Sequence, residues 1–256
     1  MLDITHEYYD SVDSTNDRIK SRAHENAKEG LVITAMNQTK GKGRVGRKWE
    51  SPVGESVATS MLLHPTGIPM ESVPTITIVC GMAVRDALEQ LYGLDAKIKW
   101  PNDIVVNGKK ICGILVEMEA EAGKVKHVIA GIGVNVHQKT FPEEIAFKAT
   151  SVDIELKRNS SDTVSHRNQV AEAIWEAFNS YYDRFLTTAD MTNLKSEYEA
   201  HLVNLGKRVR IEDPRGAYEA TACGINERGA LIIDVDGKKE IIESGEVSVR
   251  GLYGYV

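Results

Sequence analysis

Residues 96–136 contain four β-type segments joined by connections too short for a helical crossover. The segments are AKIKW (96–100), DIVV (103–106), KICGILVEM (110–118) and HVIAGIGVNV (127–136). Asn107-Gly108 is the strongest short-range signal for a two-residue hairpin, and EAEAGK supplies a second turn. Such strands pair as antiparallel hairpins, because parallel neighbours need a long crossover. We therefore predict an α+β fold, in which helices flank a mixed β-sheet, and not a regular βαβ series.

The pattern on either side of this run predicts the flanking helices. Apolar residues at helical spacing follow Ser14 and Thr15, and Gly30 occupies the position of a helix-terminating glycine. Three more helical segments and two buried strands are predicted from the distribution of apolar residues. The predicted helices are 71–92, 163–186 and 190–202, and the predicted strands are 31–36 and 56–63.

The pattern of apolar segments and turn residues changes near residue 203. From there, short apolar segments alternate with Arg-Gly, Glu-Arg-Gly and Asp-Gly turns, a pattern typical of a small all-β barrel. We therefore predict two domains, 1–202 and 203–256.

Charge and cysteine content disfavour several classes of protein. The 31 Lys and Arg against 37 Asp and Glu give a net charge of −6, which disfavours binding to nucleic acid by bulk charge. Three scattered cysteines without a CxxC motif, and seven histidines without metal-ligand spacing, predict neither a disulfide framework nor a protein-bound metal. No signal peptide or membrane segment is expected, so we predict a cytoplasmic protein.

The basic segment around GKGRVGRKW (41–49) is the first candidate site. Residues 40–48 carry five basic residues and no acidic one. Glycines let backbone N–H groups approach an anion, and guanidinium groups fit phosphate oxygens, so an irregular anion-clamping loop is favoured over a merely solvated one. The match to G-x-G-x-x-G is formal, because Pro52 and Gly54 discourage the helix that a dinucleotide motif must open.

The segment KWPND (99–103) and its hairpin form the second candidate site. A regular two-residue hairpin places Val105 opposite Lys110 and Asp103 opposite Cys112, so all four side chains share one face. Because lysine is rarely buried unpaired, this lysine forms either a structural ion pair or part of an active site.

Two further segments carry weaker signals. The residues VDSTN (12–16) predict a helix N-cap and also hydroxyl and amide groups that suit a neutral polar ligand. The alternate glycines of GIGVN (131–135) imply close approach of a ligand or a backbone, and Asn135 could contact a purine. Trp49 and Trp100 adjoin polar segments where an indole ring can stack on a base.

Together these four segments resemble the biotin protein ligases. The family patterns GRGRxGRxW, KWPND followed by K-x-x-G-I-L-x-E, STN and GIGVN occur in the family order within residues 8–136. The last 50 or so residues fit the family's small SH3-like barrel. Lys42 departs from the usual arginine, which keeps the charge but loses the bidentate fork.

The resemblance implies the fold and the reaction. The catalytic domain would be like the class II aminoacyl-tRNA synthetases and the biotin-lipoate ligases. The enzyme would use ATP and Mg²⁺ to activate biotin as biotinyl-5′-AMP, then transfer biotin to a lysine of a biotin carboxyl carrier protein. Because STN begins at residue 14, we expect a monofunctional ligase without a winged helix, binding neither nucleic acid nor membrane. A homodimer through an exposed sheet edge stays open.

The resemblance also implies roles for individual residues. The catalytic residues would be Arg44, Asp103 and Lys110, with Asp103 near the substrate's Mg²⁺ or in the orienting network. The biotin-binding residues would be Ser14, Thr15, Asn16, Gln38, Gly41, Lys42, Gly43, Arg44, Lys110, Gly113 and Gly131. The residues that bind ATP or the adenylate would be Arg44, Arg47, Trp49, Lys99, Asn102 and Asn135.

Three alternatives differ in class. A lipoate- or octanoate-protein ligase shares the fold but is expected to lack the glycine-arginine loop and the KWPND string. A biotin-sensing regulator without enzymatic activity is disfavoured by the missing winged helix. An RNA-binding module built on the basic loop is disfavoured by the net charge of −6.

Overall fold

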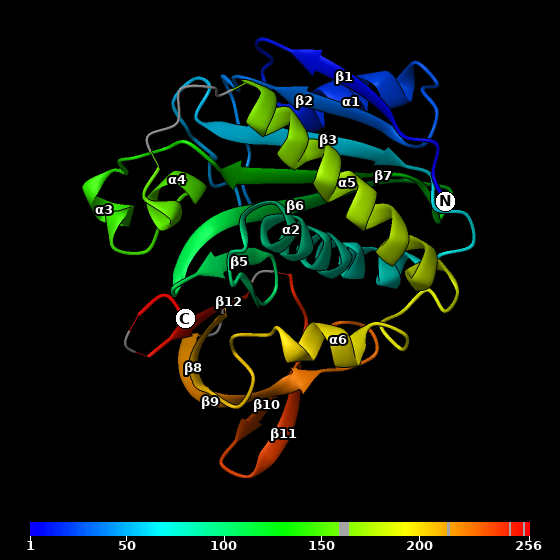
Figure 1. Ribbon diagram of the computed structural model, residues 1–256. Helices are drawn as coiled ribbons and strands as arrows, with labels where there is room; N and C mark the ends of the chain where they lie inside the picture. Colours follow the sequence, from blue (N-terminus) through cyan, green and yellow to red (C-terminus); the bar gives the residue numbers. More distant parts are fainter. Residues whose placement is uncertain (159–163, 214–215, 246, 253) are drawn as a thin grey trace.

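A seven-stranded mixed sheet forms the main body of the protein in a computed structural model that describes residues 1–158, 164–213, 216–245, 247–252 and 254–256 (Figure 1). Its strand order is β1-β2-β3-β7-β6-β5-β4. Only the pair β1 and β2 among these described strands is parallel, and the other neighbours are antiparallel, as the short connections predict. The strands are β1 (Thr5–Tyr9), β2 (Leu31–Ala35), β3 (Ser56–Leu63), β4 (Lys97–Lys99), β5 (Asp103–Val106), β6 (Lys109–Glu121) and β7 (Lys124–Asn135).

Helices cover both faces of this sheet. Helix α1 (Thr15–His24) lies on one face, and helices α2 (Ile76–Tyr92) and α5 (Val164–Leu186) cover the other (Figure 1). Successive side chains of a strand point to opposite faces, so β2 serves two cores: Ile33 packs with Ile19 of α1, whereas Val32 joins the larger core under α2 and α5. None of the described helices is both long and apolar enough to cross a membrane. The shorter helical elements are η1 (Met70–Thr75), α3 (Glu143–Ala146), α4 (Val152–Leu156) and α6 (Lys195–Ala200).

Both predicted hairpin turns are present. Asn107 and Gly108 have φ angles of 50° and 75°, and Ala122 and Gly123 have φ angles of 49° and 75°. Two consecutive left-handed residues are the mark of a type I′ turn, whose twist matches the flanking strands. The β5–β6 and β6–β7 hairpins therefore follow from local sequence.

A β-bulge changes the register that we predicted for the first hairpin. Val105 lies opposite Lys110 as expected, but the register shifts between Ile104 and Val105. Asp103 consequently lies opposite Gly113, not opposite Cys112. The extra residue of a bulge reverses the alternation of side chains, so Cys112 enters the apolar core, away from the face shared by Asp103 and Lys110.

The boundaries of two helices also differ from the prediction. Helix α1 ends at His24, well before Gly30, which has a φ of +87° at the start of β2. A Cβ on Gly30 would lie 2.4 Å from the carbonyl oxygen of Asp3, so close approach of the backbone explains this glycine. Gly93 does cap α2 in the left-handed conformation, as expected. The predicted helix 190–202 is shorter, Lys195–Ala200, and residue 163 of the predicted helix 163–186 lies outside the described residues.

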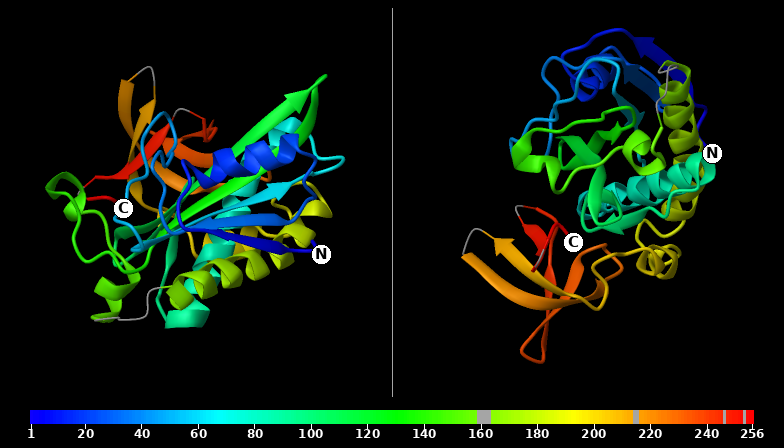
Figure 2. Two further views of the ribbon diagram at one scale, coloured as in Figure 1. Left: turned by 90° about the horizontal axis from the view of Figure 1, so that it is seen from above. Right: turned by 60° about the vertical axis from the view of Figure 1, so that its left-hand side comes forward.

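The carboxyl-terminal strands form a separate five-stranded antiparallel sheet with the order β11-β10-β9-β8-β12. This sheet packs against the end of the main body near β4 and β5 (Figure 2). One contact between the two parts is a hydrogen bond of 2.9 Å that the indole N–H of the fully buried Trp100 donates to the carbonyl of Gly229. The division of the chain at residue 202 stays a prediction. The strands are β8 (Arg208–Asp213), β9 (Gly216–Ile225), β10 (Leu231–Val235), β11 (Lys238–Ile242) and β12 (Ser248–Gly251).

Candidate active site

An open cavity lies where the main sheet, the basic loop and the carboxyl-terminal sheet meet. Residues from the start of α1, from strands β4 to β7, and from β12 and the chain end contribute to its wall. All the predicted site residues line it except Gly41 and Asn135. The amide of Asn135 is buried and donates to the carbonyl of Thr150, so this side chain serves the fold and not the cavity.

The first turn of α1 presents fixed polar groups to the cavity. Ser14 has the extended backbone of an N-cap, but its hydroxyl makes no capping hydrogen bond. The backbone N–H and the hydroxyl of Thr15 both donate to the side-chain oxygen of Gln38, at 2.7 and 3.0 Å. Because these residues are more than twenty positions apart, this contact couples the helix start to the segment between β2 and the basic loop.

Asn16 is held by two side chains that sequence reasoning missed. Its amide nitrogen donates to the carboxylate of Glu117 at 2.6 Å, and its oxygen accepts from the hydroxyl of Ser60 at 2.6 Å. The Asn16 side chain also explains Gly131, where an added Cβ would lie 2.1 Å from the Asn16 oxygen. The predicted close approach at the alternate glycines is therefore that of a side chain to the sheet.

The indole ring of Trp49 lies over a part of the sheet that lacks side chains. Gly113 and Gly133 are paired across β6 and β7, and an added Cβ would lie 3.1 Å and 2.6 Å, respectively, from ring atoms. The indole nitrogen is buried and has no hydrogen-bond partner among the described residues. Lys110 Nζ lies 5.9 Å from the ring centroid. This wall offers an aromatic face beside a cation.

The basic loop is more regular than predicted. The N–H of Gly43 donates to the carbonyl of Arg47 at 2.7 Å, and the N–H of Trp49 donates to the carbonyl of Gly41 at 3.0 Å. Between them Val45 and Gly46 adopt positive φ angles of 54° and 69°. The segment is thus a short hairpin, because consecutive left-handed residues form a tight turn that an unpatterned charged loop does not need.

Arg44 connects this loop to both domains. Its guanidinium donates to the side-chain oxygen of Asn102 at 2.9 Å and to the backbone carbonyls of Ser244 and Gly245. These are neutral acceptors, and no carboxylate forms an ion pair with Arg44 or Arg47 in the part of the chain that is described. Burial lowers the pKa of Arg44, although it stays charged at neutral pH.

Asp103 is the centre of the site. Its carboxylate lies 2.5 Å from Lys110 Nζ and 3.9 Å from Lys99 Nζ, and it accepts a hydrogen bond from the Tyr255 hydroxyl. Burial acts to raise the pKa of Asp103, but the two ammonium groups outweigh it and hold the pKa below its usual value. Burial lowers the pKa of Lys99 to about 8, and Asp103 offsets part of this shift. The carboxylate is thereby fixed in its charged form.

Cations outnumber anions around the cavity. Asp103 is the one carboxylate among the described lining residues. Two of the basic groups have carboxylate partners elsewhere, since Lys42 contacts Asp17 and Arg250 lies 2.7 Å from Glu212. The remaining basic lining residues are Arg44, Arg47, Lys48, Lys99 and Lys110. Such a cluster disfavours binding of a cation and favours a multiply charged anion.

Sequence reasoning missed the contribution of the carboxyl-terminal domain. Tyr255 reaches Asp103 across 152 positions, its ring faces Lys99 Nζ at 4.2 Å, and the Ser248 hydroxyl accepts from Arg47 at 3.3 Å. No spacing rule connects these positions, and only the docking of the two sheets brings them together.

Comparison with known proteins agrees with this geometry. Family models match residues 8–135 (Biotin/lipoate A/B protein ligase family) and residues 205–250 (Biotin protein ligase C terminal domain). The bifunctional ligase/repressor BirA of Bacillus subtilis is 34% identical over 94% of this chain and 73% of its own length. The biotin--[acetyl-CoA-carboxylase] ligase of Mycobacterium tuberculosis is 30% identical over 91% of this chain and 85% of its own length.

A solved structure shows the same architecture over both domains. The biotin protein ligase of Aquifex aeolicus, determined in complex with biotin and ATP, matches with a TM-score of 0.83 and 30% identity. The match covers 96% of this chain and 99% of that one. Since the sequence motifs, the fold and both family models agree, the chain belongs to the biotin/lipoate A/B protein ligase family and, within it, to the biotin protein ligases.

Proposed function

We propose that this chain activates biotin with ATP and transfers it to a lysine of a biotin carboxyl carrier domain. The observation that carries the proposal is the cavity in which basic side chains outnumber the one lining carboxylate, Asp103, which lies 2.5 Å from Lys110 Nζ. Biotin presents a carboxylate and ATP presents a triphosphate, so two anions must meet there. Relatives named biotin--[acetyl-CoA-carboxylase] ligase support a carboxylase as the acceptor.

The first step forms a mixed anhydride. A carboxylate oxygen of biotin attacks the α-phosphorus of ATP, the bond from that phosphorus to the bridging oxygen breaks, and pyrophosphate leaves. Lys110 and Arg44 lie on the cavity wall where they can neutralise both anions, and fixed positive groups of this kind lower the barrier to charge build-up. Asp103 acts as a positioning residue, because its carboxylate pairs with Lys110 and accepts a hydrogen bond from the Tyr255 hydroxyl.

The second step transfers the acyl group. The lysine amine of the carrier domain attacks the acyl carbon of biotinyl-5′-AMP, and AMP leaves with the electrons of the broken anhydride bond. The anhydride reacts with water, so the site must exclude solvent until the lysine arrives. The loop hairpin forms part of the cavity wall, and Arg44 joins it to the carboxyl-terminal domain.

The two ends of the cavity have different chemistry. The neutral donors and acceptors of Ser14, Thr15 and Asn16 suit the ureido group of biotin. The indole face of Trp49 and the nearby cations suit adenine and phosphate.

Magnesium enters as part of the nucleotide substrate. Asp103 does not fit the role of a magnesium ligand, because its oxygens face two ammonium groups and a hydroxyl donor. Phosphate oxygens and water are the partners that Mg²⁺ takes in many nucleotide sites. We therefore assign no step to a protein-bound magnesium ion.

Mass spectrometry of an acceptor domain tests the function. After incubation with this protein, biotin and MgATP, the domain should gain one biotinyl group on its lysine. Omission of ATP and an acceptor with the lysine replaced by arginine are the controls. Transfer of lipoate or octanoate in place of biotin would overturn the proposal.

Gly131→Ala should weaken biotin binding by about 10–100-fold, because overpacking a close contact costs about 1–3 kcal/mol. The new methyl group would displace Asn16 from its place beside Ser60 and Glu117. Gly81→Ala is the matched control, since its Cβ would meet only atoms at 3.5 Å or more. Isothermal titration of biotin measures both variants, and unchanged affinity in Gly131→Ala would show that Asn16 does not contact biotin.

Affinity for the adenylate should fall by about tenfold as pH rises through 8 and Lys99 loses its charge. One ammonium close to a phosphate contributes about 1–2 kcal/mol to the binding free energy at a partly screened site. The pKa of Lys99 is lowered to about 8, so the group is charged below this pH and neutral above it. A non-hydrolysable analogue of biotinyl-5′-AMP measures binding at pH 7 and pH 9.5. Lys99→Met should bind weakly at both pH values, and an equal pH dependence in this variant would assign the titration to another group.

A further inference from the structure

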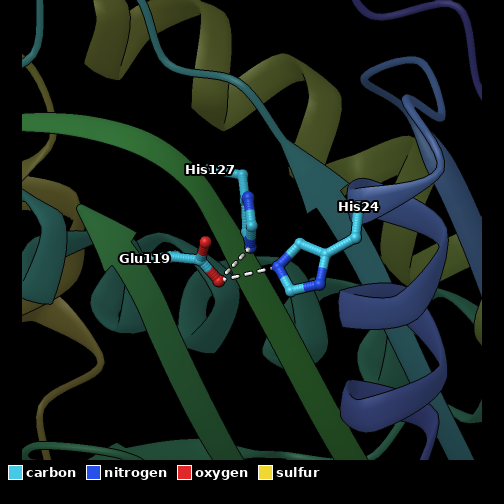
Figure 3. A group of neighbouring side chains, drawn as sticks. All are labelled: His24, Glu119 and His127. Atoms are coloured by element: carbon cyan, nitrogen blue, oxygen red, sulfur yellow. Dashed lines mark hydrogen bonds and ion pairs between the residues drawn. The ribbon is translucent and has the colours of Figure 1, made fainter. Parts of the chain in front are cut away.

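Two histidines and a glutamate converge outside the active site. His24 ends α1, Glu119 lies on β6, and His127 lies beside it on β7 (Figure 3). His24 Nε2 lies 2.9 Å from Glu119 Oε2, and His127 Nε2 lies 3.6 Å from the same oxygen. All three ligand atoms lie within 4.8 Å of one another, and none of these residues lines the active-site cavity described above.

The buried imidazole of His127 points to a missing ligand. This residue is only 1% exposed, yet its Nε2 atom has no hydrogen-bond partner among the described residues. Buried polar atoms are nearly always satisfied, so such an exception calls for a partner of another kind.

We propose that His24, Glu119 and His127 bind one Zn²⁺ ion or a similar divalent transition metal. The donors are two imidazole nitrogens and one carboxylate oxygen, a set that zinc accepts and that magnesium and calcium do not favour. Ligand atoms around tetrahedral zinc lie about 3.3 Å apart, given bonds of about 2.0–2.1 Å. The observed separations of 2.9 and 3.6 Å bracket this value. Water would take the fourth position on the exposed side near His24.

The neighbouring side chains leave room for the ion. Lys126 Nζ and Lys20 Nζ lie 3.5 and 3.9 Å from the Glu119 carboxylate. Both side chains are about half exposed, 41% and 53%, so they can turn to solvent when a cation replaces them. His64 is close in space but is not a ligand candidate, because its Nδ1 lies 3.2 Å from the carbonyl of Lys126.

The site would tie the far end of α1 to the β6–β7 hairpin. The first turn of the same helix carries Asn16, and Glu117, which holds Asn16, lies two residues before Glu119 on β6. A metal bound outside the cavity would therefore hold α1 and β6 together, and these two elements shape the proposed biotin end of the cavity. It takes no part in the chemistry.

Metal binding by the untagged chain tests the proposal. Zn²⁺ titrated by calorimetry should bind with one ion per chain, and Co²⁺ should give the visible absorption of a low-symmetry four-coordinate site. His24→Gln and Glu119→Gln remove exposed or half-exposed ligands, so both variants are expected to fold. Each should weaken binding by about 10–100-fold or more, since even outer partners of a metal ligand contribute that much.

His64→Gln is the matched control, a neighbouring histidine that should leave the affinity unchanged. Circular dichroism of each variant without metal checks that the fold is kept. No saturable Zn²⁺ binding, or binding that His24→Gln and Glu119→Gln leave unchanged, would overturn the proposal. The proposal would also be overturned if His64→Gln weakened Zn²⁺ binding as much as His24→Gln and Glu119→Gln do.

Discussion

Lys110→Gln is expected to slow the formation of biotinyl-5′-AMP by about 10²–10³, the usual effect of removing one preorganised group that stabilises developing charge. Lys110 Nζ lies on the cavity wall, 2.5 Å from Asp103 and beside the indole of Trp49. Glutamine keeps a hydrogen-bond donor and much of the length but removes the charge. The barrier rises because biotin and the α-phosphate are both anionic.

Pyrophosphate release at saturating biotin and MgATP measures this step. Lys109→Gln is the matched control, because Lys109 is the preceding residue, is exposed and does not line the cavity. The melting temperature of each variant separates chemistry from folding. Lys110→Gln should lose only about 1–2 kcal/mol of stability, since its amide can still donate to Asp103. An adenylation rate close to that of the unmodified chain would make Lys110 structural.

Asp103→Asn is expected to destabilise the folded protein by about 3–5 kcal/mol at pH 7, the range for removing one partner of a buried ion pair. Asp103 is 7% exposed and Lys99 is 5% exposed, so little water can replace the lost charge. Asparagine keeps the shape and can accept from Tyr255, but it leaves the buried ammonium of Lys99 without a counter-charge.

The lowered pKa of Lys99 determines in which direction the stability of Asp103→Asn changes with pH. In the folded protein the pKa of Lys99 lies at about 8, below its usual 10.5, and loss of Asp103 lowers it further. Unfolding then takes up a proton, so the stability of Asp103→Asn should recover as pH rises toward 9.5. The pKa of Asp103 is lowered instead, so the unmodified chain loses the contribution of this carboxylate only as pH falls below the usual aspartate pKa of 3.8.

Urea unfolding at pH 7 and pH 9.5 measures both effects. Tyr255→Phe is the control, because it removes only the hydroxyl that donates to Asp103. That loss should amount to about 1–2 kcal/mol relative to the unmodified chain, and this difference should be the same at pH 7 and pH 9.5. If Asp103→Asn unfolds at the same urea concentration as the unmodified chain at pH 7, the buried pair does not stabilise the fold.

Local sequence determined much of the framework. The type I′ turn at Asn107-Gly108, the glycine cap at Gly93 and strand β3 at 56–63 were all predicted, and all are present. Each depends on neighbours a few residues apart, whose steric and hydrogen-bonding preferences act in any fold. The motifs of the candidate site could be recognised from their residue types and from the resemblance to the biotin protein ligases, and the roles of their residues stay predictions.

Tertiary packing decided where those groups finally point. The bulge between β5 and β6 moved Cys112 into the core and left Asp103 opposite Gly113. The hairpin turn alone cannot specify such a shift, because it arises from packing of both faces of the sheet. Likewise Asn135, which has the right residue type for a ligand contact, is directed by its strand to the Thr150 carbonyl.

Contacts between distant segments were beyond the reach of the sequence. Tyr255 meets Asp103 only because the carboxyl-terminal sheet docks beside the main one. The histidines were expected to bind no metal, yet His24 and His127 converge on Glu119 because α1 crosses the sheet at the end of the β6–β7 hairpin. Residue type and local spacing thus determined the chemistry that is available. The packing of helices and sheets determined which groups meet, because contacts between distant segments depend on the packing of the whole core and no local rule encodes them.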